Sequence, residues 1–249
     1  MRGMNAGPAP SYATIRRDFQ PRLVVEDVLV DYYAKTISPF LTRVFVVAGV
    51  APNAVTILMI LFGIAGACVF AIPPVWCKVC GLVLIHFWYV LDCSDGEVAR
   101  ITKRFSKFGA ELDFTAHVVC HPLFNLAFAL SLVSLGRYST TTILFVSILS
   151  ISSELILRNQ LAFQQIYSLK MQTAYGAAGK RSLLKQAAIT LLNALSMYPN
   201  FALVFPIFFL VDYFAGTSIA FYYLCLHTAI STVVAIRASI RWVRVIAEM

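Results

Sequence analysis

Charged side chains are scarce in this chain. They make up 13% of its 249 residues, whereas soluble globular domains carry about 25%. Hydrophobic residues account for 59%, and the mean hydropathy is +0.78. This composition excludes a soluble globular domain. It predicts an all-α integral membrane protein, with one membrane domain over residues 23–249 after a flexible N-terminus at 1–22.

Paired cysteines and internal repeats are also lacking. Six cysteines are scattered, and the lone Cys77-x2-Cys80 pair has no second pair with which to bind zinc. No internal repeat is evident, which argues against the commonest transporter plans. The formal charge of +8 lies in short basic segments beside apolar runs, so it indicates membrane topology rather than a nucleic-acid partner.

Long apolar runs supply six candidate transmembrane helices. A bilayer core of about 30 Å needs about 20 helical residues. Suitable runs occupy residues 53–70, 75–100, 108–135, 140–167, 183–211 and 217–243. Before them, residues 24–45 mix apolar and charged side chains at helical spacing. This pattern predicts an amphipathic interfacial helix on the membrane surface, with Pro39 as a candidate break.

Basic residues are unevenly distributed over this six-span plan. The N-terminus, the loops at 101–107 and 168–182, and the C-terminus share one side. The intervening loops hold only Lys78 and Arg137. The positive-inside rule therefore predicts that both termini and the 101–107 loop face the cytoplasm.

Acidic residues cluster on both sides of the 101–107 loop. Two sets of residues recur at helical spacing: Asp92, Asp95, Gly96 and Ala99 before the loop, and Gly109, Asp113 and His117 after it. Each set shares one helix face, so the two helices can bring three carboxylates and an imidazole around one volume. Carboxylates this close repel one another unless a cation lies between them, and oxygen ligands suit Mg²⁺, Mn²⁺ or Ca²⁺.

A family resemblance is carried by the pattern Asp92-x2-Asp95-Gly96-x2-Ala99-Arg100-x8-Gly109-x3-Asp113. It resembles the signature of the CDP-alcohol phosphatidyltransferase family, D-x2-D-G-x2-A-R-x8-G-x3-D-x3-D. His117 stands where that signature has its last Asp. The six-span plan and the Pro52-Asn53-x2-Thr56 entry to the first span are also similar to the family.

The resemblance implies an enzyme in which an alcohol acceptor attacks a CDP-linked donor and CMP leaves. It implies one or two ions of Mg²⁺ or Mn²⁺, held by Asp92, Asp95, Asp113 and His117. It also implies a donor site formed by Asn53, Thr56, Gly96, Ala99, Arg100 and Gly109, where small residues leave room for the nucleotide. The family further implies a homodimer.

The substitution at His117 leaves three interpretations open. Imidazole, whose unperturbed pKa is about 6.5, suits a general base, and it also binds softer divalent metals. His117 is the catalytic base beside Asp113, a filler of a one-metal site, or the mark of an inactive relative. The intact remainder of the motif favours an active variant. His121, one turn later, is a second and weaker candidate for the same role, and is rather expected to pack or to form a hydrogen bond.

The resemblance implies that the motif contacts the cytidine end of the donor and not its alcohol. CDP-diacylglycerol with a polar acceptor is the favoured pairing, and a small CDP-alcohol with a lipid acceptor fits equally well. Two alternatives are a catalytically silent nucleotide-binding relative and a cation transporter. The clustering of three acids at one membrane boundary argues against the transporter.

Other polar residues have two interpretations each. Glu154 and Arg158 are spaced for a helical ion pair or mark a functional site within the fourth span. A basic group in the next loop suits substrate phosphates or lipid headgroups: Lys170, Lys180, Arg181 and Lys185. Arg237, Arg241 and Arg244 form a stripe that is expected to face headgroups.

Overall fold

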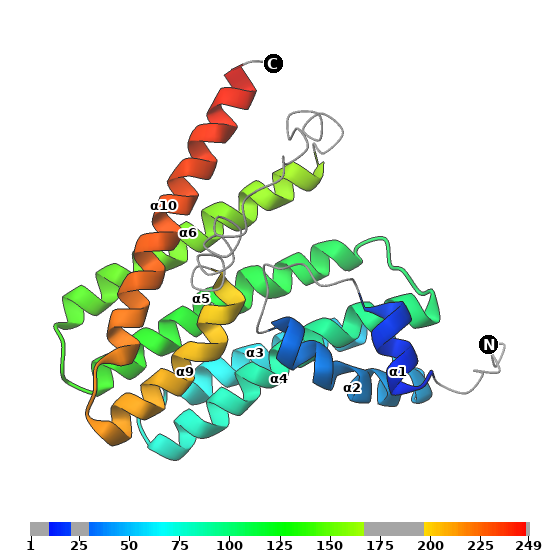
Figure 1. Cartoon of the computed structure of the whole chain (residues 1–249), viewed down its shortest axis with the longest axis horizontal. Coiled ribbons are helices and arrows are strands. Elements are labelled where there is room, and N and C mark those ends of the chain that lie inside the picture. The colour runs from blue at the N-terminus through cyan, green and yellow to red at the C-terminus, as the bar shows by residue number, and fades with distance from the viewer. Residues whose placement is uncertain (1–9, 21–29, 167–196, 248–249) are drawn as a thin grey trace, which may run out of the picture. The chain divides into compact units, whose positions relative to one another are not determined.

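The computed structural model describes residues 10–20, 30–166 and 197–247, and the regular elements among them are helical. In chain order they are α1 (Tyr12–Thr14), η1 (Ile15–Phe19), η2 (Val30–Ala34), α2 (Lys35–Val47), α3 (Pro52–Ala71), α4 (Val75–Thr102), α5 (Gly109–Ser134), α6 (Thr140–Ile166), α9 (Tyr198–Ala215) and α10 (Ile219–Ala247) (Figure 1). Six of these, α3 to α6, α9 and α10, are long and apolar enough to cross a membrane. The predicted fold class is confirmed.

The spans begin and end within a few residues of the predicted limits, with one exception. The described part of the fifth span is α9, Tyr198–Ala215, and residues 183–196 of that prediction lie outside the described residues. The same holds for the predicted basic group between Lys170 and Lys185 and for residues 24–29 of the predicted interfacial helix.

Proline and a left-handed residue mark the ends of the two helices that lead into the motif. α3 begins with Pro52 after an extended Ala51 and ends at Ala71, shortly before Pro73. Proline suits the first turn because the nitrogen there has no partner within the helix. α4 ends at Thr102, and the capping residue Lys103 has a φ of 54°, which is uncommon for a residue other than glycine. The chain thus turns directly after the first half of the acidic motif.

The chain divides into two compact units, residues 1–127 and 128–249, and α5 contributes to both. In the first unit, α3 and α4 pack closely. A Cβ atom added at Gly81 would lie 2.6 Å from the backbone of Phe70, and one added at Gly63 would lie 2.6 Å from the side chain of Trp88. Glycines let the helices approach each other, which fixes the position of the helix that carries the first half of the motif.

The helix α2 directs two of its hydroxyl side chains inward. Ser38 and Thr42 are buried and donate hydrogen bonds to Glu97 of α4. The exposed apolar side chains of the helix are Ile37, Phe40, Val44 and Val47. Helices of soluble proteins have the opposite arrangement, whereas an exposed apolar face suits a helix that lies in the membrane interface. The helix continues through Pro39, so the predicted break there is wrong.

The second unit is held together by polar contacts between α6 and α10. The hydroxyls of Ser153 and Thr232 lie 2.9 Å apart, and Gln160 donates to the Ser239 hydroxyl at 2.8 Å. Within α6, the Arg158 Nε lies 2.8 Å from the Glu154 Oε1. The ion-pair interpretation of these two residues is therefore confirmed.

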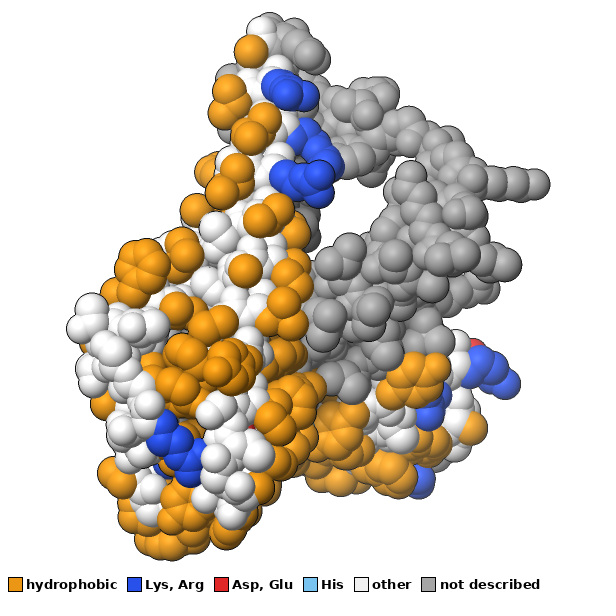
Figure 2. Space-filling model, turned by 60° about the vertical axis from the view of Figure 1, so that its left-hand side comes forward, with side chains coloured by type: hydrophobic (Ala, Val, Ile, Leu, Met, Phe, Trp, Pro, Cys, Tyr) orange, Lys and Arg blue, Asp and Glu red, His pale blue; other side chains and the backbone are white. Residues whose placement is uncertain are grey.

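The surface of the molecule matches a membrane environment. Hydrophobic side chains are spread over much of the described part of the face shown in Figure 2. Basic side chains gather towards the C-terminal end of α10, where Arg237, Arg241 and Arg244 are exposed (Figure 2). A charged stripe at the end of an apolar helix is the arrangement expected next to lipid headgroups.

Candidate metal and nucleotide site

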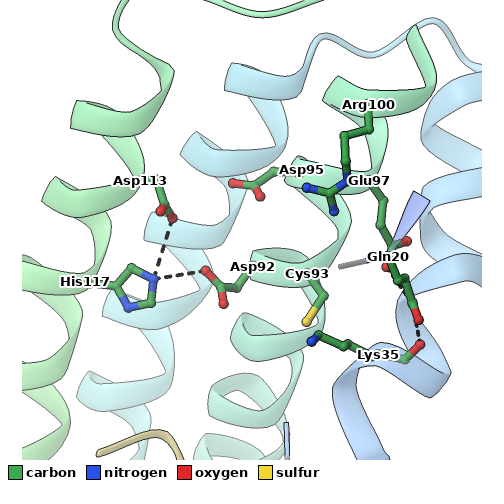
Figure 3. A pocket seen from close by; sticks show the side chains of 10 residues that line it. Gln20, Lys35, Asp92, Cys93, Asp95, Glu97, Arg100, Asp113 and His117 are labelled. Carbon is green, nitrogen blue, oxygen red and sulfur yellow. Dashed lines mark hydrogen bonds and ion pairs between the residues drawn. The ribbon is translucent and has the colours of Figure 1, made fainter. Parts of the chain in front are cut away.

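A cavity of about 340 Å³ lies in the first unit, beside the acidic motif. It is lined by Gln20, Lys35, Asp92, Cys93, Asp95, Gly96, Glu97, Arg100, Asp113 and His117 (Figure 3). The motif helices α4 and α5 supply most of these side chains. The segment before the first span supplies Gln20 and Lys35, which the sequence interpretation did not include.

Three of the predicted ligands meet at one point. One ligand atom from each of Asp92, Asp113 and His117 lies within 4.8 Å of the other two. The His117 Nε2 lies 3.0 Å from the Asp92 Oδ1 and 3.5 Å from the Asp113 Oδ1 (Figure 3). The structure therefore brings together the two helix faces as their spacing predicts. Two carboxylates and an imidazole are a donor set that suits Mn²⁺ and related divalent cations.

Asp95, the fourth predicted ligand, is outside this group of three and is held from another helix. Its Oδ2 accepts a hydrogen bond of 2.7 Å from the Thr56 hydroxyl of α3. Thr56, predicted from its place at the entry to the first span, thus contacts the motif directly. This hydrogen bond orients the carboxylate and ties the start of α3 to the end of α4.

The ring of His117 is enclosed by aromatic and imidazole groups. Its Nδ1 lies 3.2 Å from the Nε2 of His121, which is fully buried. Trp88 packs edge-on against His117 with the ring centroids 4.9 Å apart. The expected packing or hydrogen-bonding role of His121 is confirmed. Trp88 was not predicted, although it lies one helical turn before Asp92 on α4.

Arg100 folds back over the motif. Its Nε donates to the Phe19 carbonyl, and a Cβ added at Gly96 would lie 3.0 Å from one of its terminal nitrogens. The end of the Arg100 side chain therefore lies next to Gly96, which itself lines the cavity, and the predicted role of Gly96 in leaving room for a nucleotide stays a prediction. The guanidinium itself faces the cavity (Figure 3).

The remaining predicted donor-site residues, Asn53, Ala99 and Gly109, are not among those that line the cavity. A Cβ added at Gly109 would lie 3.9 Å from the Asn53 Oδ1, so the starts of α3 and α5 are near neighbours. Ala99 is partly buried on α4. Their assignment to nucleotide binding stays a prediction.

A buried carboxylate connects the N-terminal segment to the motif. Glu97 is 1% exposed and accepts hydrogen bonds from Gln20 Nε2 (2.8 Å), the Ser38 hydroxyl (2.5 Å) and the Thr42 hydroxyl (2.6 Å). Burial of a carboxylate is unfavourable unless several donors compensate for the lost water. Besides Asp92 and Asp95, the motif helix α4 therefore carries Glu97, an acid with a structural role on the side turned towards α2.

A model of the family described as CDP-alcohol phosphatidyltransferase matches residues 49–215. That range contains the spans α3 to α6 and α9 and every residue of the acidic motif. Among curated proteins, no significant match is found.

Proposed function

Because the chain belongs to the CDP-alcohol phosphatidyltransferase family, we propose that it moves a substituted phosphate from a CDP-linked donor to an alcohol acceptor and releases CMP. In this reaction a new P–O bond forms to the acceptor oxygen, the P–O bond to CMP breaks, and the acceptor loses its hydroxyl proton. The observation that carries the proposal is the convergence of Asp92, Asp113 and His117.

A divalent cation fits these residues. Two carboxylates directed at one imidazole nitrogen repel each other, and a cation between them removes that repulsion. We propose that Asp92, Asp113 and His117 hold Mg²⁺ or Mn²⁺, with Asp95 as a ligand of a second ion. When bound, such a cation stabilises negative charge on the phosphates. The nitrogen ligand favours Mn²⁺ over the harder Mg²⁺.

His117 has a second candidate role as the base that takes the acceptor's proton. The observation in its favour is that Trp88 and His121 fix the ring with Nε2 towards the site. Both roles use Nε2, because Nδ1 faces His121. Replacement of His117 by alanine separates them: loss of Mn²⁺ affinity indicates a ligand, and loss of turnover at unchanged affinity indicates a base.

The side chains around the reacting groups orient the donor. Thr56 holds the Asp95 carboxylate, and Arg100 places its guanidinium at the cavity, where it can contact a phosphate oxygen. We propose CDP-diacylglycerol with a polar acceptor as the substrate pair, and a small CDP-alcohol with a lipid acceptor as the alternative. We further expect a homodimer with both termini and the cavity on the cytoplasmic side, on the basis of the family and the basic loops.

The test is CMP formation by the purified protein in nanodiscs. It uses Mg²⁺ or Mn²⁺, CDP-diacylglycerol or small CDP-alcohols as donors, and polyols or extracted lipids as acceptors. We expect CMP only when both a cation and an acceptor are present. CDP binding without CMP from any pairing would indicate a silent relative, and cation flux without CDP binding would indicate a transporter.

A further inference from the structure

The interfacial helix α2 turns one of its two basic residues into the site cavity. Lys35, at the start of the helix, lines the cavity, and its side chain points towards Cys93 of α4 (Figure 3). Arg43 of the same helix is exposed. Interfacial helices place basic residues towards headgroups and water, as α2 does with Arg43. The inward orientation of Lys35 departs from this rule and brings its positive charge to the cavity.

The backbone that carries Lys35 is fixed by several hydrogen bonds. Gln20 donates to the Lys35 carbonyl at 2.6 Å and to the Glu97 carboxylate at 2.8 Å. One and two turns along α2, the hydroxyls of Ser38 and Thr42 bind the same carboxylate. These hydrogen bonds hold the start of α2 against the motif helix α4. Lys35 therefore lies at one wall of the cavity.

The cavity is lined by both acidic and basic side chains. Of the lining residues that the structure describes, Lys35 and Arg100 are the permanently cationic ones. In Figure 3, Lys35 lies on the opposite side of Asp92 from Asp113 and His117. A diphosphate bound at those acids through a cation would have further oxygens that could reach the Lys35 side of the cavity. Lysine binds phosphate as a point charge on a flexible stem.

We propose that Lys35 binds a phosphate oxygen of the CDP-linked donor, and that Glu97 is the positioning residue that holds α2 in place for this contact. The inference rests on the proposed function and deepens it. It extends the donor site from the motif to the helix that lies at the membrane surface. That helix thereby connects the lipid interface with the reacting diphosphate.

The experiment measures equilibrium binding of CDP, in the presence of Mn²⁺, to the full-length protein in nanodiscs. Lys35→Met should weaken CDP binding roughly 10- to 100-fold, the range for loss of a hydrogen bond to a charged group. Cytidine, which carries no phosphate, should bind to wild type and to Lys35→Met with equal affinity. Lys35→Arg should retain most of the affinity.

The matched control is Arg43→Met, which removes one positive charge from the exposed face of the same helix. It should change CDP affinity by no more than about twofold, because exposed charges act weakly at a distance. Thermal unfolding checks that each variant is folded, and Lys35→Gln replaces Lys35→Met if the latter is not. Equal CDP affinity in wild type and Lys35→Met overturns the proposal, as does an equal loss in Arg43→Met.

The role of Glu97 is tested by a double-mutant cycle. Glu97→Gln should weaken CDP binding, and the double variant Glu97→Gln/Lys35→Met should bind CDP no more weakly than Lys35→Met alone. Additive losses would contradict a positioning role. If wild type binds neither CDP nor CDP-diacylglycerol, the proposed function itself fails and this proposal falls with it. Failure of the Lys35 contact alone leaves wild-type CDP binding intact.

Discussion

The acidic residues of the two units are stabilised in different ways. In the second unit, Asp212 is buried and accepts hydrogen bonds from the backbone nitrogens of Ile219 and Ala220 at the start of α10. In the first unit, Asp92 and Asp113 both face the same ring nitrogen of His117. A nitrogen carries one proton at most, so it cannot satisfy both carboxylates. The hydrogen bonds of Asp212 complete a helix end, whereas the arrangement of Asp92 and Asp113 suits a cation.

Glu97 shows that position within the motif does not decide which arrangement an acid adopts. It lies two residues after Asp95, yet three donors from the N-terminal segment surround its carboxylate. Like Asp212, it holds parts of the fold together. The groups that its oxygens contact, and not its place in the motif, therefore decide the role of each acid.

The largest effect is expected for the acids that face His117. Asp113→Asn should reduce CMP formation on the order of 10³-fold, because a cation ligand at the reacting phosphate is lost. Its thermal unfolding temperature without divalent cations should stay the same or rise, because a repulsive charge is removed. Asp212→Asn, the matched change, should keep CMP formation per folded molecule and lower the unfolding temperature. The same outcome for both variants would remove the distinction.

A smaller effect is expected for His121, which contacts the proposed cation ligand His117. His121→Phe keeps the aromatic volume but removes the hydrogen bond to His117, and should weaken Mn²⁺ binding roughly 10- to 100-fold. His121→Gln, which can still donate or accept at that position, should weaken it less. Electron paramagnetic resonance of free Mn²⁺ gives both affinities without any need for turnover. Unchanged affinity in His121→Phe would mean that His117 is not a ligand oriented by His121.

The smallest effect is expected for the ion pair in α6. Replacing both Glu154 and Arg158 by glutamine should leave CMP formation unchanged and alter the free energy of unfolding by about 1 kcal/mol or less. Glu154→Gln alone should be more destabilising than the double change, because it leaves a mostly buried arginine without its carboxylate. Thermal unfolding of the single and double variants measures this order. A loss of CMP formation in the double variant would show that the pair has a role in function.

Much of the fold could be predicted because its signals are local. Each span is a continuous apolar run set by the thickness of the bilayer, and Pro52 and Pro73 mark the ends of α3 in the sequence itself. The convergence of Asp92, Asp113 and His117 was also predictable, since residues four apart share a helix face. These inferences need no knowledge of which distant segments pack together.

The N-terminal wall of the cavity could not be predicted, because it depends on a contact between distant parts of the chain. An amphipathic helix can turn either face to the protein, and only the packing of α2 against α4 shows that Ser38 and Thr42 point inward. The prediction of a break at Pro39 considered the backbone alone, and the helix continues through this buried residue. The contact between Arg100 and the Phe19 carbonyl could not be predicted for the same reason, since these two residues lie far apart in the sequence.

The central claim is that Asp92, Asp113 and His117 hold a divalent cation at the diphosphate of the donor. The most direct test is electron–nuclear double resonance of Mn²⁺ bound to the full-length protein in nanodiscs with CDP. The account predicts ³¹P coupling from the CDP phosphates to the bound Mn²⁺ and ¹⁴N coupling from His117, with the ¹⁴N coupling lost in His117→Ala. Bound Mn²⁺ without ³¹P coupling, or with both couplings unchanged in Asp113→Asn and His117→Ala, would contradict it.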